Sequence, residues 1–330
     1  MGRLPIIFPC TPKTITSLKR RSYTFLPPAR SRGLSLSECC FTEIEFPRYH
    51  RGSVCYPLVS SWPEKAKMPN RELIISPGNV LSKSCTWRKG NESASEELYE
   101  SLRSCIEQQQ KEIQANICTN GNIVGVITNP DNSDDEITES RQELKITVKL
   151  FIYSLNPDDI LSAIKNSLKG VSADYLDSVV VSFAGQSGST PLSLDVMQKV
   201  WTTLEETVES SLVKMIGLCD VDSQLFIQLY EWAKMKPSIV QINLASCCVV
   251  PPELATFTKE HDIQLLTHSD PINVLPEDKV ESLVKPFQHL VGEEGNNLNW
   301  RAKWALRYQI HVKCRGVLAS KGYIASFSTV

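Results

Sequence analysis

LKITVKLFIYSLNPDDILSAIKNSLKGVSADYLDSVVVSFA, from Leu144 to Ala184, is the stretch that decides the fold class of this chain. Its first part, Lys145–Tyr153, alternates polar and apolar residues and then turns apolar, as a β-strand does. Pro157 stands in the first turn of a predicted helix that Gly170 ends. Leu176–Ala184 is then an apolar run rich in β-branched residues, which is typical of a strand buried on both faces. The stretch predicts a β-α-β unit with parallel strands.

The same alternation continues to the last predicted strand, near Leu318. The sequence predicts six strands from Leu144 onward, near Val148, Val180, Ile216, Ile242, Leu265 and Leu318. Asp222 is placed to cap one of the intervening helices, and further helices are predicted over Asp278–Leu290 and Trp300–Val312. Trp300 and Trp304 then lie one turn apart, and we expect them in the core. Strict alternation predicts a parallel sheet with right-handed crossovers.

Six strands are two fewer than a closed (β/α)8 barrel needs, so the missing pair must come from before Leu144. That region offers a helix over residues 96–115 and a short apolar run, Ile123–Ile127. A polar, acidic stretch over residues 129–143 predicts a solvated loop. An open doubly wound sheet is the competing arrangement. It usually carries a glycine-rich nucleotide turn, and no GxGxxG or GxxxxGK[ST] motif occurs in the sequence.

Residues 1–67 differ from the rest of the chain. Basic and proline residues are frequent there, and no acidic residue precedes Glu38. We expect an N-terminal extension that is disordered or not native, followed by one barrel domain over residues 68–330. A transit peptide, a disordered tail and translation from upstream of a true start at Met68 remain alternatives.

Composition narrows the class of protein. The net charge of the 330-residue chain is −2, which gives no sign of nucleic-acid binding, and no apolar run is long enough to span a membrane. The chain has 11 cysteines without CxxC spacing, which favours a reduced, cytoplasmic setting and argues against a structural zinc site. We expect no metal. His268 and Asp270 follow a predicted strand, but two donors without a third predict a capped turn instead.

Several ordered blocks of the sequence resemble one known family. They are Ile216–Pro271, which begins IGLCDVDSQLF, together with Ile146–Ile152, Leu176–Val181 and Leu306–Ile324. They resemble the regulatory (modifier) subunits of glutamate–cysteine ligase, a distant branch of the aldo-keto reductase superfamily. The resemblance covers roughly Glu96 to the C-terminus and is dense from Leu144. It implies an α/β fold of the (β/α)8 barrel type, which decides between the barrel and the open sheet.

The resemblance also implies that the reductase site is not intact. The superfamily uses a tyrosine as proton donor, a lysine and an aspartate that tune its pKa, and a histidine that orients the substrate. Lys149 matches the lysine, but Ser182 stands where the histidine is expected. Tyr99, the only tyrosine between Met68 and Leu144, has no aspartate five residues before it. We expect Lys149 to be a vestige held in an internal ion pair, with no catalytic residue.

Two further sites are weaker predictions. Lys321 is the best candidate for residual NADPH binding, although Ser320 and Lys321 reverse the order of the superfamily's phosphate-binding pair, and we expect no cofactor. Cys247 and Cys248 are adjacent and follow a predicted strand, where barrels place functional loops. The hypothesis is that at least one of them lies at a subunit interface and forms a redox-sensitive link.

The function implied by the resemblance is regulatory. Such a chain forms a heterodimer with the catalytic (heavy) subunit of glutamate–cysteine ligase in glutathione biosynthesis, raises its substrate affinity and relieves its feedback inhibition by glutathione. A divergent NADPH-dependent reductase is the first alternative, and a redox sensor built on Cys247 and Cys248 is the second.

Overall fold

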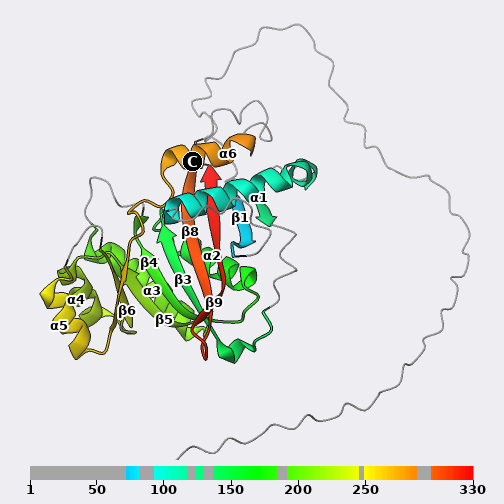
Figure 1. Cartoon of the computed structure of the whole chain (residues 1–330). Coiled ribbons are helices and arrows are strands. Elements are labelled where there is room, and N and C mark those ends of the chain that lie inside the picture. The colour runs from blue at the N-terminus through cyan, green and yellow to red at the C-terminus, as the bar shows by residue number, and fades with distance from the viewer. Residues whose placement is uncertain are drawn as a thin grey trace, which may run out of the picture. The chain divides into compact units, whose positions relative to one another are not determined.

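Alternating apolar side chains build a mixed sheet in the computed structural model (Figure 1). The strands are β1 (Glu72–Asn79), β2 (Val124–Thr128), β3 (Leu144–Ile152), β4 (Leu176–Ser182), β5 (Val213–Cys219), β6 (Ile239–Asn243), β7 (Gln264–His268), β8 (Trp300–Val312) and β9 (Val317–Thr329). The helices are α1 (Ala94–Asn116), α2 (Pro157–Gly170), α3 (Leu194–Glu209), α4 (Ser223–Trp232), α5 (Pro252–Glu260) and α6 (Glu277–Val284), and a 3₁₀ turn, η3 (Arg141–Glu143), precedes β3.

The structure describes residues 72–81, 93–116, 124–128, 137–184, 192–244, 249–287 and 299–329. All of them belong to one structural unit, Lys65–Val330. The expected N-terminal extension, residues 1–67, lies outside the described residues, as do most of the acidic stretch and the pair Cys247 and Cys248. Within the described ranges, every helix is too short or too polar to cross a membrane.

The strand order among the described residues is β2-β1-β9-β8-β3-β4-β5-β6-β7. Strands β3 to β7 are parallel to one another, joined by α2 to α5, as the alternation predicted. β1 and β2 form a second parallel pair and supply the two strands that were expected before Leu144. The predicted α/β fold class is confirmed.

The sheet differs from a regular eight-unit barrel in two respects. β8 and β9 form an antiparallel hairpin that lies between β1 and β3 and pairs with both. β2 and β7 stand at the two ends of the strand order, so the described strands do not complete a ring. The prediction of a helix over Trp300–Val312 was wrong, because this segment is β8. Its side chains at 304, 306, 308, 310 and 312 are buried with a period of two, which a strand requires.

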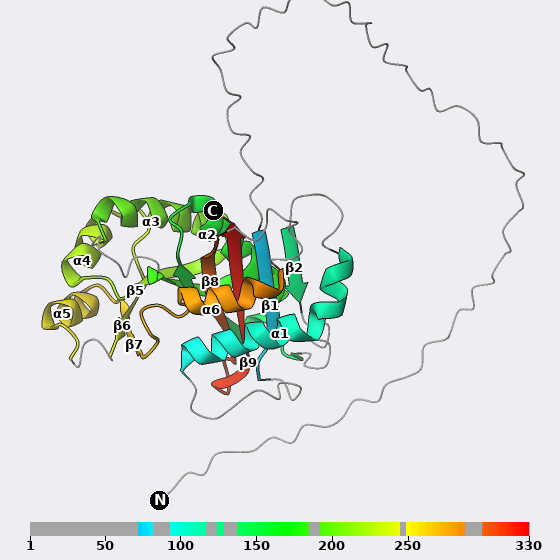
Figure 2. The same cartoon turned by 90° about the horizontal axis from the view of Figure 1, so that it is seen from above.

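Two apolar cores form because the strands bury side chains on both faces. One lies between the sheet and helices α2 to α5, and it includes Ile146, Val148 and Leu150 of β3 and Trp304 of β8. The other lies under α1 and α6, on the opposite side of the strands (Figure 2). It contains Phe151 of β3, and Trp300 of β8 also lies there. Both tryptophans are therefore core residues, as expected, although on a strand.

The helices begin where the sequence provides caps. Asn156 and Asp222 accept backbone N–H groups of the first turns of α2 and α4, and Pro157 is the first residue of α2. In β9, Gly322 is required by close packing, because a Cβ atom there would lie 2.2 Å from the carbonyl oxygen of Gly78. The hairpin can therefore approach β1 only at a glycine.

One buried carboxylate joins the amino ends of three neighbouring strands. Asp177 of β4 accepts the backbone N–H of Ile146 of β3 at 2.8 Å, and its other contacts are Arg141 at 2.9 Å and Lys214 of β5 at 3.5 Å. Burial opposes its charge, but the hydrogen bonds from Ile146 and Arg141 outweigh burial and lower the pKa of Asp177.

Asp177→Asn is expected to lower the free energy of unfolding by about 1.5–3 kcal/mol at neutral pH, because the bonds it weakens are charge-assisted. Because the pKa of Asp177 is lower in the folded state, its ionised carboxylate stabilises the fold at pH values above the unfolded pKa of about 3.9. This stabilisation is lost as the pH falls through the folded pKa, so the difference in stability between the variant and the wild type should shrink in acid. Urea unfolding at several pH values measures this. Asp174→Asn, at an exposed position nearby, is the matched control. Equal losses in the two variants would contradict the assignment.

Candidate functional site

The carboxyl ends of the parallel strands bring polar side chains together at one edge of the sheet. Ser182 ends β4, Cys219 ends β5, Asn243 ends β6 and His268 ends β7. Active sites of parallel α/β folds lie at this edge, because the loops that follow the strands converge there. It is the candidate site.

A pocket of about 440 Å³ opens at this edge. Its polar lining comes from Ser182, Cys219, Asp220, Asp222, Ser223 and Asn243. Its apolar lining includes Phe183, Leu192, Leu254 and Ile272. Ile272 is 56% exposed, so the apolar wall reaches the surface of the protein. A pocket with apolar walls and a few convergent polar groups suits a small ligand.

Lys149 lies beneath this edge in a buried ion cluster. Its Nζ is 2.8 Å from Oδ2 of Asp270, and both side chains are only 6% exposed. Arg307 of β8 holds the same carboxylate with two bonds, of 2.6 Å and 3.0 Å. Burial opposes the charge of Asp270, but His268, Arg307 and Lys149 outweigh it and hold its pKa well below the ordinary range. Asp270 is therefore a charged hub between two cations.

The cluster extends across the C-terminal hairpin to α1. The hydroxyl of Tyr323 donates to Oε2 of Glu97 at 2.8 Å, and Lys321 forms an ion pair with the same carboxylate. Burial and the charge of Glu97 raise the pKa of Tyr323 above its ordinary value. Lys321, the residue considered for NADPH binding, is thus placed against Glu97.

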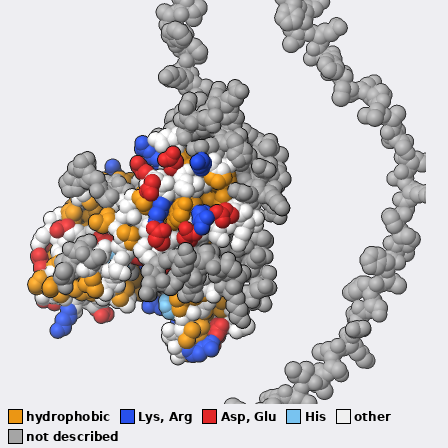
Figure 3. Space-filling view, turned by 45° about the horizontal axis from the view of Figure 1, so that its top comes forward, with side chains coloured by type: hydrophobic (Ala, Val, Ile, Leu, Met, Phe, Trp, Pro, Cys, Tyr) orange, Lys and Arg blue, Asp and Glu red, His pale blue; other side chains and the backbone are white. Residues whose placement is uncertain are grey.

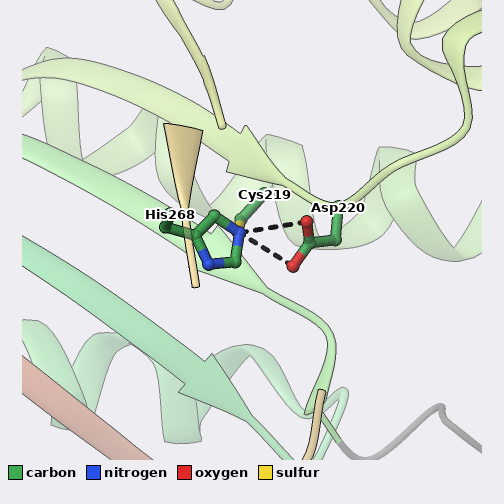
Figure 4. Close-up of side chains that lie close together, drawn as sticks. All are labelled: Cys219, Asp220 and His268. Atoms are coloured by element: carbon green, nitrogen blue, oxygen red, sulfur yellow. Dashed lines mark hydrogen bonds and ion pairs between the residues drawn. The ribbon is translucent and has the colours of Figure 1, made fainter. Parts of the chain in front are cut away.

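His268 lies between two carboxylates. Its Nε2 is 3.0 Å from Oδ1 of Asp220 and 3.0 Å from Sγ of Cys219 (Figure 4). Its Nδ1 is 3.4 Å from Oδ2 of Asp270. The backbone N–H of Asp270 also approaches Nδ1, at 3.1 Å. Burial favours the neutral ring, but the bonds to Asp220, Asp270 and Cys219 outweigh burial and raise the pKa of His268 to about 10. A neutral ring places its hydrogen on Nε2, toward Asp220, and protonation adds one on Nδ1, toward Asp270.

The turn after β5 places two of these side chains on the same pocket. Successive residues of a strand point to opposite faces, but Asp220 has φ +57° and turns the chain directly after Cys219. Both residues therefore line the pocket. Asp220 is held there by its backbone N–H, which donates to Gln241, and by Oδ1, which accepts the N–H of Asn243 at 2.8 Å.

Sequence reasoning found part of this arrangement. Lys149, Ser182, His268 and Asp270 were singled out, and the structure places all four at or beneath one edge of the sheet. Cys219, Asp220 and Arg307 were missed. Cys219 and Asp220 follow a predicted parallel strand, as His268 does, so the shared edge was a usable signal for them. Nothing in the sequence signalled Arg307, because its segment was predicted to be a helix.

Two comparisons with known proteins concern the general class of the fold. The model of the aldo/keto reductase family matches residues 131–273, which is less than half of the chain. Aldose reductase from Giardia lamblia is similar in structure over 53% of each chain, with 19% identity and a TM-score of 0.33.

The more specific match is to one group of proteins. The human glutamate–cysteine ligase regulatory subunit is 35% identical over 265 residues, which cover 77% of this chain and 92% of the human protein. A putative glutamate–cysteine ligase regulatory subunit of Schizosaccharomyces pombe is 26% identical over 61% of this chain and 77% of its own length. The chain belongs to the glutamate–cysteine ligase regulatory subunit family.

Asp270 and Lys149, two members of the ion cluster, should differ in their effect on stability. Asp270→Asn leaves the buried Lys149 and the partly exposed Arg307 without this counter-ion and is expected to lower the free energy of unfolding by about 3–5 kcal/mol. Lys149→Met leaves Asp270 paired with Arg307, so its loss should be smaller. Chemical unfolding of the two variants at neutral pH gives the ranking. A larger loss for Lys149→Met would show that Asp270 is not the hub.

Proposed function

We propose that this chain is a non-catalytic regulatory subunit that binds the catalytic subunit of glutamate–cysteine ligase in the cytoplasm. Membership of the regulatory subunit family is the observation that carries the proposal. In the complex, the chain raises the affinity of the catalytic subunit for its substrates and relieves its inhibition by glutathione. This requires that it bind one conformation of the catalytic subunit more tightly than another.

The residues that stand at the positions of the reductase catalytic groups support a non-catalytic role. A proton donor in carbonyl reduction must deliver its proton to the substrate, and a neighbouring lysine assists by lowering its pKa. Lys149 is paired with Asp270, so the question is whether a proton donor accompanies this pair. Tyr323 reaches the same cluster, but its hydroxyl donates to Glu97 and its pKa is raised, so it is a poor acid. Ser182 has no ring nitrogen with which to orient a carbonyl.

The surface over α1 and α6 supports a protein partner rather than a nucleic acid. Acidic and basic side chains are intermixed on the face seen in Figure 3. On α1, Arg103 pairs with Glu100 at 2.6 Å and with Glu107 at 2.8 Å. Lys279 of α6 pairs with Glu96 of α1 at 2.6 Å. This face therefore presents no field of a single sign that would attract a polyanion.

The regulatory role predicts a measurable change in the partner. Mixing the full chain with the catalytic subunit should give a complex in gel filtration, a lower KM for glutamate and weaker inhibition by glutathione. A coupling typical of regulated proteins corresponds to a change of about 5-fold or more in these constants. The catalytic subunit with an equal amount of an unrelated protein is the control. No complex, together with unchanged kinetics, would refute the proposal.

A divergent NADPH-dependent reductase is the alternative that the fold keeps open. We expect the chain neither to quench NADPH fluorescence nor to oxidise NADPH in the presence of aldehydes, because Lys321 is paired with Glu97 and, among the described residues, the tyrosine that reaches the cluster of Lys149 donates its hydroxyl to Glu97. An intact aldo-keto reductase assayed in parallel is the positive control. Aldehyde-dependent turnover that disappears in Lys149→Met would reverse the assignment.

The interface role of Cys247 and Cys248 stays a hypothesis beside this proposal. Changing both to serine should weaken partner binding or remove a disulfide-linked band from non-reducing gels. Unchanged binding and unchanged mobility would rule it out.

A further inference from the structure

We propose that Cys219, Asp220 and His268 form a binding site for one zinc ion, with its open coordination position facing the pocket. Three donor atoms of different chemistry converge there from the ends of β5 and β7 (Figure 4). This inference is independent of the regulatory role, because it concerns a site within the chain that needs no partner.

The distances between the donor atoms suit a small ion. Sγ of Cys219 lies 3.0 Å from Nε2 of His268 and 3.3 Å from Oδ2 of Asp220, and Nε2 lies 3.0 Å from Oδ1 of Asp220. Donors bound to tetrahedral zinc at about 2.0–2.3 Å are about 3.5 Å apart. Outward shifts of a few tenths of an ångström would therefore admit the ion, and zinc would replace the hydrogen bonds that now join these atoms.

The choice of zinc follows from the donor set. A thiolate and an imidazole select borderline metals such as zinc, whereas magnesium and calcium prefer oxygen ligands alone. The thiolate of Cys219 and the carboxylate of Asp220 would together balance the charge of a divalent ion. The charges of Lys149 and Arg307 are directed to Asp270, which is not one of the three donors.

Two features around the donors are also found in known protein metal sites. Oδ2 of Asp270 lies 3.4 Å from Nδ1 of His268, so that when zinc replaces the hydrogen on Nε2 the ring can keep its other hydrogen on Nδ1, directed to this carboxylate. Cys219 and Asp220 line the pocket of about 440 Å³, so the fourth position would be open to water or to a small ligand. Three protein ligands with one open position are typical of reactive rather than purely structural zinc sites.

The turn after β5 brings two of the donors together. Asp220 adopts a positive φ of 57°, which aspartate tolerates better than most residues. This conformation brings its carboxylate to the side on which Cys219 lies. A strand that simply continued would direct the two side chains to opposite faces and separate the donors.

The test uses the full chain, reduced and stripped of metal. Cobalt(II) is added as a spectroscopic probe, and zinc is then added to displace it. The wild type should show a thiolate-to-cobalt charge-transfer band, which zinc abolishes and magnesium does not. Because the chain has 11 cysteines, the comparison between variants decides. Cys219→Ser and His268→Gln should each bind one equivalent less of cobalt, or bind it about 100-fold more weakly.

Two cysteine variants serve as matched controls. Cys105→Ser changes another buried cysteine, and Cys314→Ser changes an exposed one, and neither residue belongs to the cluster. Both should retain the wild-type stoichiometry. The same stoichiometry and affinity in Cys219→Ser as in the wild type would overturn the proposal.

A second measurement covers the case in which Cys219→Ser does not fold. The side chain of Asp220 is 29% exposed, so Asp220→Asn should be tolerated. Zinc should raise the melting temperature of the wild type and of Cys314→Ser, and should raise that of Asp220→Asn much less. An equal rise in all three proteins would show that zinc binds elsewhere. None of these experiments contains the catalytic subunit, so failure here leaves the regulatory proposal untouched.

Discussion

Asp270 places a carboxylate between Lys149 of β3 and Arg307 of β8, where the side chains are almost shielded from solvent. Two buried cations need this counter-ion, because a charge without a partner in such surroundings costs several kcal/mol. The same carboxylate reaches the ring of His268. One side chain therefore ties the parallel strands, the C-terminal hairpin and the edge of the pocket together. The carboxylate therefore has a structural role at the edge where the polar side chains converge.

The parallel part of the fold could be predicted because its signals are local. Lys145–Tyr153 and Leu176–Ala184 read as strands, and Asp222 and Pro157 mark where helices begin. The prediction of a helix over Trp300–Val312 was wrong for an identifiable reason. Trp300 and Trp304 have helical spacing among good helix formers, and this spacing was given more weight than the alternation with period two from Trp304 to Val312. The position of the hairpin between β1 and β3 depends on pairings between distant segments, which no local pattern encodes.

The candidate site was predictable only as an edge of the sheet. Parallel strands bring their carboxyl ends together, and Ser182, His268 and Asp270 had each been singled out at or after the end of a strand, although not as one group. The turn at Asp220 could not be foreseen, because the residues that hold it, Gln241 and Asn243, belong to another strand. The ion pair between Lys149 and Asp270 could not be predicted either, because Asp270 lies far from Lys149 in the chain and had been interpreted as part of a turn.

The C-terminal hairpin has a consequence for how the chain reaches its fold. Among the described strands, β1 and β2 pair with the rest of the sheet through β9, and β3 is joined to them through β8. The centre of the sheet is therefore built from residues that leave the ribosome after all the other described strands. Until they emerge, two unpaired strand edges stay exposed, and such edges invite association between chains. Contacts between segments so distant in sequence also form slowly, so we expect chaperone dependence during synthesis to be concentrated in the step at which β8 and β9 join the sheet.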